Sequence, residues 1–376
     1  MVSLDGFRWD YLERGVSPYL TEIALKGVKA KSLKPQFPSM TFPNHYSIIT
    51  GLYPEHHGII ANNFHNPFNK DSFSLKKPNV ENAYWYRGEA FWETAKRNNI
   101  KTASYFWPGS EMNLEYRRPD YYHSYEHTLG YETRVKGVLD WLKLPDSLNP
   151  RFITLYFDET DSKAHRFGTN SKELNQGISR VDSMIRMLDS GLISLKIQDK
   201  VNLIVISDHG MTDIFEHTAI NIKKILDSDT NNVSIVNHSS LGWIFLKDKS
   251  KVNEIYSKLN MNKSRYRVFK KQDFPKRFNY GNHPFIGDIV IVPEIGWHIT
   301  DGRKWDGKYV ATHGFDNEEI DMHGIFLARG PSFKTNYNVG TLNNLDIYPL
   351  LCKIFGISHG SKIDGDLDRI IHILKE

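Results

Sequence analysis

Acidic and histidine side chains follow several apolar runs of this sequence. Asp5 follows "VSL", Asp161 and His165 come after "FITLYF", and Asp208 and His209 come after "NLIVIS". Carboxylate oxygen together with imidazole nitrogen is a ligand mixture that suits Zn²⁺, whereas harder ions prefer oxygen alone. If these runs are neighbouring parallel strands, their carboxyl ends meet in one crevice, where a cation would relieve the repulsion between the acids. The pattern predicts a zinc site.

Each of these residues also has an ordinary explanation when it is taken alone. An aspartate after a strand is usually a turn residue or a helix N-cap, and a loop histidine is usually solvated or hydrogen bonded. His313, in the turn "THGFDN", adds a further imidazole. The convergence of the whole set, rather than any one member, favours a metal site.

Thr41 lies in the segment "FPSMTFPNHYSIITG", between two prolines. Pro43 suits the first turn of a helix that would run to Gly51, so Thr41 is expected at a helix N-terminus, where free N–H groups favour a phosphate. The hydroxyl could simply cap that helix. It becomes a nucleophile only if a base or a metal lowers its pKa, and two zinc ions about 4 Å apart are an arrangement known for phosphoryl displacement.

The elements that would position these residues alternate between strand and helix. This alternation predicts an α/β fold: a doubly wound, mostly parallel sheet flanked by helices. We expect a single catalytic domain over residues 1–376 and a smaller, irregular α+β insert around residues 221–297. The expected strands lie within residues 1–6, 151–161, 201–210, 288–294 and 324–330, and the expected helices within residues 17–27, 88–99, 131–144, 173–192 and 343–356.

Composition narrows the class of protein further. The 376 residues are 40% apolar and 24% charged, with a net charge of +4, and these values are typical of a globular protein. No long Lys/Arg block is present, so no stable nucleic-acid partner is expected. The sequence also has no run of about 18 apolar residues, so no membrane span is predicted. Cys352 is the only cysteine, which rules out an intrachain disulfide and favours simple buried packing.

Seven motifs together resemble the nucleotide pyrophosphatase/phosphodiesterases of the alkaline phosphatase superfamily, in particular the single-domain bacterial members. The resemblance runs in order over essentially the whole chain, and its most specific part is the Thr-Phe-Pro-Asn-His-Tyr stretch. The motifs are "SLDGFRWDYL", "FPSMTFPNHYSIITGLYPEHHGII", "YFWPGSE", "DETDSKAHRFG", "SDHGM", "HGFDN" and "DIYPLLCKIFG".

The resemblance implies a site with two Zn²⁺ ions and Thr41 as the nucleophile. One set of ligands would be Asp5, Thr41, Asp208 and His209, and the other would be Asp161, His165 and His313. His45, His56 and His57 would not be ligands.

The same resemblance implies how a nucleotide would be held. Asn44 and Asn62 would contact phosphate oxygens, and the backbone N–H of Phe42 together with Asn44 would stabilise the developing charge. Phe42 and Tyr125 would sandwich the nucleobase. Without the resemblance, Asn44 is an ordinary first-turn residue, Asn62 a turn former, and both aromatics are core or rim side chains.

The implied activity is hydrolysis of phosphodiester or pyrophosphate bonds in nucleotides. It would release nucleoside 5′-monophosphates through a phosphothreonine intermediate. A sulfatase would need Cys or Ser followed by x-Pro-x-Arg, and alkaline phosphatases use serine with an arginine, whereas this chain has Thr-Phe-Pro-Asn. Two alternatives stay open: a choline-type phosphodiesterase acting on lysophospholipid or glycerophosphocholine, and a catalytically dead binding protein of the same fold.

Cellular location and assembly are expectations by analogy as well. The bacterial relatives are usually exported, so a periplasmic or extracellular protein is expected whose signal segment is absent from this chain. The first apolar run is also short for a buried strand. A monomer is the expected state.

Overall fold

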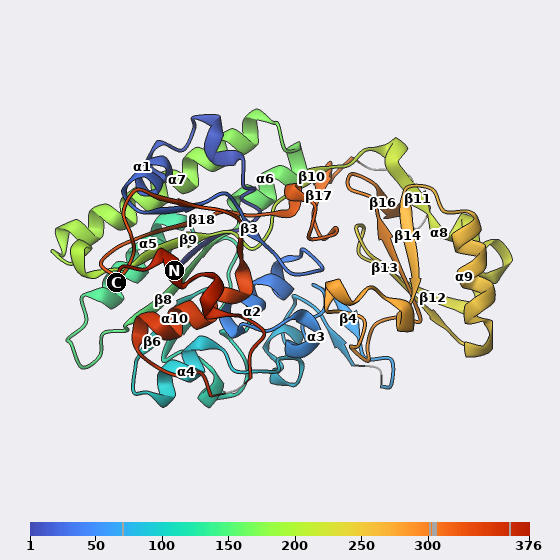
Figure 1. The fold of residues 1–376 in the computed structure, drawn as a ribbon, viewed down its shortest axis with the longest axis horizontal. Helices are drawn as coiled ribbons and strands as arrows, with labels where there is room; N and C mark the ends of the chain where they lie inside the picture. The colour runs from blue at the N-terminus through green and yellow to red at the C-terminus, as the bar shows by residue number, and fades with distance from the viewer. Residues whose placement is uncertain (70, 301, 303–306, 361) are drawn as a thin grey trace.

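An eight-stranded sheet forms the centre of the protein (Figure 1). The computed structural model describes residues 1–69, 71–300, 302, 307–360 and 362–376. Across the sheet the strands follow the order β19 (Tyr337–Val339), β2 (Val28–Ala30), β18 (Phe326–Arg329), β9 (Leu203–Ile206), β1 (Val2–Leu4), β8 (Phe152–Phe157), β6 (Thr102–Tyr105) and β7 (Tyr121–His123).

All neighbouring strands in this sheet are parallel except those that flank β18. β18 runs antiparallel to both β2 and β9. The centre of the sheet, β9–β1–β8–β6, is wholly parallel, so the carboxyl ends of these strands lie at one edge. The prediction of a mostly parallel α/β sheet is therefore confirmed.

Helices cover both faces of the sheet, because successive side chains of each buried strand point to opposite sides. In β9, Leu203 and Val205 join one core, and Ile204 and Ile206 join the other. The first core is completed by α1 (Pro18–Lys26), α5 (Tyr131–Leu142) and α7 (Lys172–Ser194), and the second by α2 (Thr41–Thr50), α4 (Phe91–Arg97) and α10 (Ile347–Phe355).

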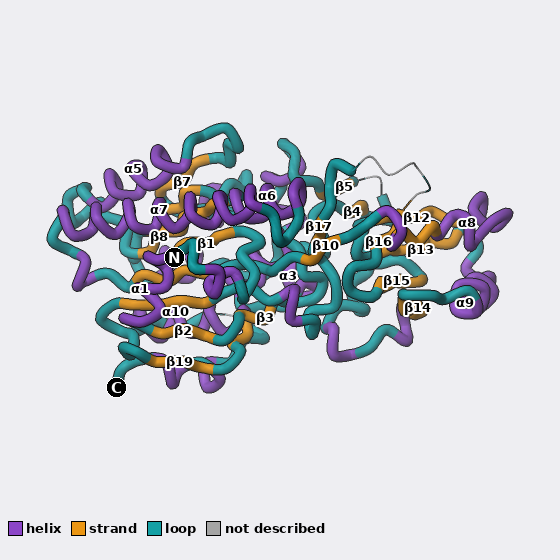
Figure 2. The backbone as a smooth tube through the Cα atoms, turned by 90° about the horizontal axis from the view of Figure 1, so that it is seen from above, coloured by secondary structure: helices purple, strands orange, loops and turns teal. Residues whose placement is uncertain are grey.

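A second, smaller lobe stands beside the main sheet, at the right of Figures 1 and 2. Its antiparallel sheet has the order β12 (Val233–Asn237), β13 (Gly242–Leu246), β15 (Ile289–Pro293) and β14 (Tyr266–Lys270), with α8 (Ile222–Leu226) and α9 (Val252–Met261) beside it. Ile289 and Ile291 pack into the core of this lobe, whereas Val290 and Val292 join the core of the main body. We had expected residues 288–294 in the parallel sheet. Their apolar run has a different cause: β15 is covered on both faces where the two lobes meet.

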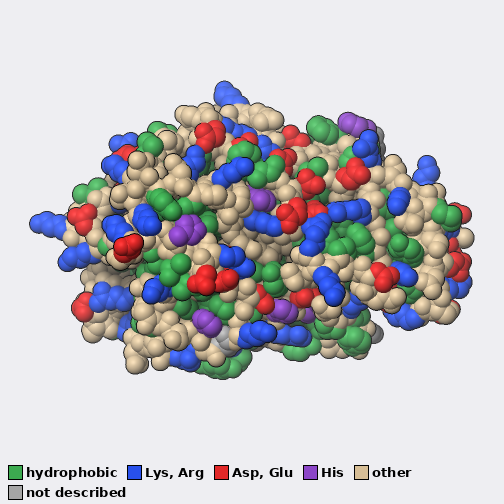
Figure 3. Space-filling view, in the orientation of Figure 1, with side chains coloured by type: hydrophobic (Ala, Val, Ile, Leu, Met, Phe, Trp, Pro, Cys, Tyr) green, Lys and Arg blue, Asp and Glu red, His purple; other side chains and the backbone are tan. Residues whose placement is uncertain are grey.

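Short elements complete the fold. They are β3 (Leu33–Lys34) with β20 (Leu342–Asn343), β4 (Phe64–His65) with β5 (Ser72–Phe73), β10 (Thr212–Asp213) with β17 (Ala311–Thr312), β11 (Ala219–Asn221) with β16 (His298–Thr300), and the helices α3 (Pro54–His57) and α6 (Glu159–Phe167). In the described part of the chain, no helix combines the length and apolarity needed to cross a bilayer. On the face drawn in Figure 3, Lys and Arg side chains lie among acidic ones rather than in one block.

Candidate active site

The candidate ligands meet at the carboxyl edge of the central strands. Asp5 directly follows β1, and Asp208 and His209 come just after β9, the parallel neighbour of β1. On the other side of β1, strand β8 leads directly into α6, which carries Asp161 and His165. We had expected Asp161 and His165 in a turn. They lie instead one helical turn apart, and this spacing puts both side chains on one face of α6.

Asp5, Asp208 and His209 form a buried group whose ligand atoms all lie within 4.8 Å of one another. The Nε2 atom of His209 is 3.1 Å from Asp208 Oδ2 and 3.4 Å from Asp5 Oδ1. These are distances at which two carboxylates and one imidazole could share a metal ion.

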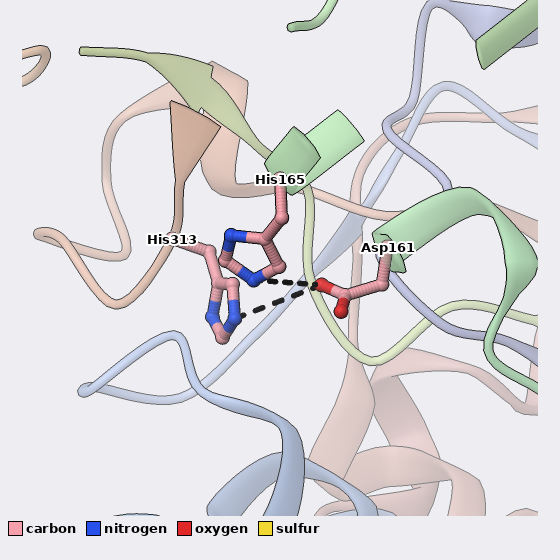
Figure 4. Close-up of side chains that lie close together, drawn as sticks. All are labelled: Asp161, His165 and His313. Atoms are coloured by element: carbon pink, nitrogen blue, oxygen red, sulfur yellow. Dashed lines mark ion pairs between the residues drawn. The ribbon is translucent and has the colours of Figure 1, made fainter. Parts of the chain in front are cut away.

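Asp161, His165 and His313 form the second group (Figure 4). The Oδ1 atom of Asp161 is 3.4 Å from His165 Nε2 and 3.7 Å from His313 Nε2. The two groups adjoin each other, since the rings of His209 and His313 stack with their centroids 3.7 Å apart.

Gly6 allows the two groups to come this close. Its φ of +63° lies in the left-handed region, and a Cβ atom there would be 2.9 Å from the Cα atom of Asp161. Only glycine can occupy that position without moving α6.

All three histidines are oriented by backbone carbonyl groups. Nδ1 of His165 donates to Ala311 O at 2.8 Å, that of His209 to Gly210 O at 2.8 Å, and that of His313 to Ser39 O at 2.9 Å. A carbonyl oxygen can only accept, so the proton is on Nδ1 and the Nε2 lone pair faces the acids. Metal-binding histidines are held in this way.

The acids themselves have oxygens that fit a metal. Asp5 Oδ1, Asp161 Oδ1 and Asp208 Oδ2 are buried and, among the described residues, have no hydrogen-bond partner. Buried carboxylate oxygens without partners are costly, and a cation in each of the two groups would satisfy them. The residues present therefore fit a metal centre.

The electrostatics of the acids point the same way. Burial and the neighbouring Asp208 raise the pKa of Asp5 well above its usual value, and burial also raises the pKa of Asp161. Burial alone would raise the pKa of Asp208 too, but His209 and His45 beside it hold that pKa below its usual value. Carboxyl groups whose charge is disfavoured by burial lose that penalty when a cation binds between them.

Thr41 is the first residue of α2, as its position between two prolines predicted. Its Oγ1 atom is 3.1 Å from Nε2 of His209. Because that nitrogen carries the lone pair, the threonine hydroxyl donates to it. The structure therefore brings the hydroxyl to the edge of the first ligand group.

Asn62 and Phe42 are joined beside Thr41. The backbone N–H of Phe42 donates to Asn62 Oδ1 at 3.0 Å. This N–H was expected to face the phosphate, but it already has a partner. The bond fixes the amide of Asn62, and the Nδ2 group of Asn62 makes no hydrogen bond within the described residues. Asn62 lines the cavity described below.

Asn44 does not occupy the position predicted for it. It is fully buried, and its Nδ2 group donates to the carbonyls of Gln36, Pro38 and Met40. Its Oδ1 atom accepts from Gln36 N and from Asn344 Nδ2. Asn44 therefore holds the loop that precedes Thr41 and has no donor left for a phosphate oxygen.

A cavity of about 660 Å³ is lined by Asp5 of the first ligand group and by all three residues of the second. Phe42 and Tyr125 both line it. The Phe42 ring packs edge-on against Phe73, and Tyr125 packs edge-on against Phe106 and Tyr156. The cavity is of a size that holds a small organic ligand.

Two residues that support the acids were missed by the sequence analysis. The hydroxyl of Tyr156 donates to Asp5 Oδ2 at 2.6 Å. The ring of His45 donates from Nδ1 to Thr41 O at 2.9 Å, and the same atom is 3.3 Å from Asp208 Oδ2. Tyr156 is an ordinary strand residue in the sequence, so only the position of β8 beside β1 could have revealed its role.

An alkaline phosphatase-like α/β fold with acid–histidine groups at the carboxyl edge of its sheet defines a class of metal-dependent hydrolases. The family model described as "Type I phosphodiesterase / nucleotide pyrophosphatase" matches residues 1–316. The chain belongs to this family.

Several relatives are similar over nearly the whole chain. Human ectonucleotide pyrophosphatase/phosphodiesterase family member 5 is 34% identical over 95% of this chain and 74% of its own length. Mouse family member 1 is 35% identical over 100% of this chain, which spans only 42% of that relative. The solved structure of human member 5 superimposes with a TM-score of 0.93 at 33% identity, covering 100% of this chain and 99% of that one. A mouse member 5 structure, 32% identical with the same TM-score, is an inactive threonine-to-alanine variant in complex with AMP; it covers 100% of this chain and 98% of that one.

Proposed function

We propose that this protein hydrolyses phosphodiester or pyrophosphate bonds in nucleotides and releases nucleoside 5′-monophosphates, with Thr41 as the nucleophile. The observation that carries this proposal is the position of Thr41. Its hydroxyl lies at the N-terminus of α2, 3.1 Å from His209 Nε2, and Thr41 lines a cavity to which both ligand groups contribute residues. A helix N-terminus favours a bound phosphate, and a hydroxyl beside a metal ligand can be activated.

We propose two Zn²⁺ ions, because both groups mix carboxylate and imidazole ligands. Asp5, Thr41, Asp208 and His209 would hold one ion, and Asp161, His165 and His313 the other. When bound, the ions lower the pKa of the threonine hydroxyl and neutralise charge on the reacting phosphate.

The residues of the chain supply the remaining steps. The Thr41 oxygen attacks phosphorus as the leaving oxygen departs, and water then hydrolyses the phosphothreonine. The hydrogen bond from the backbone N–H of Phe42 to Asn62 Oδ1 fixes the orientation of the Asn62 amide. The Nδ2 group of Asn62 then donates to a non-bridging phosphate oxygen. In this proposal Asn62 takes the role that the sequence had suggested for Asn44.

A nucleotide substrate is supported by the walls of the cavity. Phe42 and Tyr125 offer aromatic surfaces for a nucleobase. The carboxylate of Glu111 also lines the cavity. Lys77 Nζ lies 3.4 Å from its Oε2 atom, and a carboxylate has further acceptor capacity that suits a base amino group. The AMP complex of the mouse relative supports the same assignment, and the threonine replaced in that inactive variant supports Thr41 as the nucleophile.

We further propose that the protein acts outside the cytoplasm. The prefix "ecto" in the names of its relatives supports this location. We also propose that the protein is a monomer.

Thr41→Ala tests the proposed nucleophile, with Thr50→Ala at the far end of α2 as the matched control. Hydrolysis of p-nitrophenyl thymidine 5′-monophosphate should fall by at least about a thousandfold in Thr41→Ala, as expected when a nucleophile is removed. Bound metal, measured by elemental mass spectrometry, should stay close to two ions per chain. Undiminished hydrolysis in Thr41→Ala would refute the proposed mechanism.

A further inference from the structure

One wall of the cavity is formed by the second lobe. Asn237, at the end of β12, and His238 and Ser239, in the loop that leads to β13, contribute to the lining, whereas the aromatic surfaces proposed for the nucleobase belong to the main body. A phosphodiester has a second substituent on phosphorus, the leaving group. The proposed function has assigned no role to this part of the lining.

The loop is held rigidly by its own lobe. The Nδ2 group of Asn237 donates to Ile299 O at 3.0 Å, and Asn237 Oδ1 accepts from the backbone of Ser239 at 2.7 Å. Ile299 N in turn donates to Ser239 O at 2.7 Å. Ser239 has a φ of +68°, a conformation that non-glycine residues rarely adopt and that clusters at ligand-binding sites.

The loop also adjoins the proposed catalytic residues. A Cβ atom on Gly314, the residue after His313, would lie 2.3 Å from Ser240 Oγ and 3.0 Å from Met40 Cε. The loop thus packs against Gly314, the residue after one proposed ligand, and Gly314 also adjoins Met40, the residue before the proposed nucleophile. A group bound at the reacting phosphate would extend past the loop.

Two side chains of this loop, His238 and Ser240, have hydrogen-bonding capacity still unused among the described residues, and of the two only His238 lines the cavity. Its Nε2 atom is buried and has no hydrogen-bond partner among the described residues, and its ring packs edge-on against Trp243, 4.8 Å away between centroids. Burial lowers the pKa of His238 to about 4, so the ring is neutral at pH 7. A neutral imidazole offers one donor and one acceptor, and a buried polar atom without a partner is costly unless a ligand supplies one.

We infer that His238 is a specificity-determining residue that hydrogen bonds a polar, phosphate-containing leaving group of the substrate. The inference rests on the proposed function, since it assumes that the reacting phosphate lies at Thr41. It gives the second lobe a role in selecting the leaving group, while the main body binds the nucleoside.

A matched pair of substrates tests this inference. Thymidine triphosphate and p-nitrophenyl thymidine 5′-monophosphate share the nucleoside and differ in the leaving group, which is diphosphate in one and p-nitrophenolate in the other. In His238→Ala, kcat/KM for thymidine triphosphate should fall about tenfold, as expected for one lost hydrogen bond, whereas that for the p-nitrophenyl ester should change less than twofold. His238→Gln, which keeps a polar group, should recover part of the loss. His217→Ala is the control, an exposed histidine of the chain that does not line the cavity.

Equal losses for both substrates, or no loss for either, would overturn the inference. A wild-type protein that hydrolyses neither substrate would instead refute the proposed function. In that case calorimetry on Thr41→Ala decides the inference: His238→Ala in this background should weaken thymidine triphosphate binding relative to thymidine monophosphate, and an unchanged ratio of Kd values overturns it.

Discussion

Replacing Tyr156 by phenylalanine tests how far metal binding depends on the residues behind the ligands. The Tyr156 hydroxyl donates to Asp5 Oδ2 at 2.6 Å, and this leaves Asp5 Oδ1 facing His209 Nε2 at 3.4 Å. The bond also lowers the pKa of Asp5, against the larger effect of burial, which raises it. Without the hydroxyl, the carboxylate is free to rotate and binds a proton more readily, so a proton competes better with the metal.

The expected size of the effect follows from the kind of bond that is lost. A hydrogen bond to a charged group contributes roughly 1.5–3 kcal/mol, and removal of a residue that orients a ligand weakens metal binding about tenfold to a hundredfold. The Kd for Zn²⁺, measured by competition with a chromogenic chelator at pH 7, should rise by a factor in that range in Tyr156→Phe. The change should be larger at pH 6 than at pH 8.

Tyr266→Phe is the matched control. Its hydroxyl also donates a buried hydrogen bond, to Leu259 O at 2.8 Å, but lies in the core of the second lobe. This variant should lose some stability and keep its zinc affinity. A zinc Kd in Tyr156→Phe equal to that of the wild type would refute the reasoning, and so would equal losses in both variants.

Three further predictions follow from the geometry. Metal removal with a chelator should abolish hydrolysis and lower Tm, because metal at a hundred times its Kd adds about 2.7 kcal/mol to the free energy of unfolding. Added Zn²⁺ should restore both the activity and the Tm. Recovery with Mg²⁺ alone would contradict the zinc proposal. Gly6→Ala should destabilise the fold by about 1–3 kcal/mol in urea unfolding, because φ is +63° and the new Cβ would lie too close to Asp161. An unchanged free energy of unfolding would show that α6 can move to accommodate the methyl group. Burial lowers the pKa of His57 to about 3, so the unfolded chain binds a proton there first. The contribution of neutral His57 to the free energy of unfolding should be fully present above about pH 6.5. It should fall toward pH 3 by up to about 1.4 kcal/mol per pH unit. In His57→Gln the free energy of unfolding, measured from unfolding curves, should fall less steeply over this pH range.

The arrangement of the ligands could be predicted because it depends on a simple rule of α/β sheets. Parallel strands bring the residues that follow them to one edge, so Asp5, Asp208 and the segment with Asp161 had to meet. The helix that begins at Thr41 could also be predicted, from Pro43 in its first turn and Gly51 at its end. These features are local in sequence or follow from strand direction alone.

The features that could not be predicted depend on contacts between distant segments. Asn44 and Asn62 are both polar residues shortly after Thr41, and only the packing of Gln36 and Asn344 around Asn44 shows that it is buried. The run at 288–294 has the composition of a parallel strand because it is covered on both faces, but its covering comes from two lobes. The apolar pattern of a strand indicates that its faces are buried, but it does not indicate which elements cover them.

The strand order of the main sheet has a consequence for the order of events during synthesis. The residues of the two ligand groups are scattered from Asp5 to His313, so neither group exists in a nascent chain until most of the protein has left the ribosome. Contacts between such distant segments form late in folding, after the chain entropy of closing long loops has been overcome. A metal ion bound by these groups could therefore stabilise the finished protein but could not guide its early folding. Its uptake would mark molecules whose central sheet has already closed.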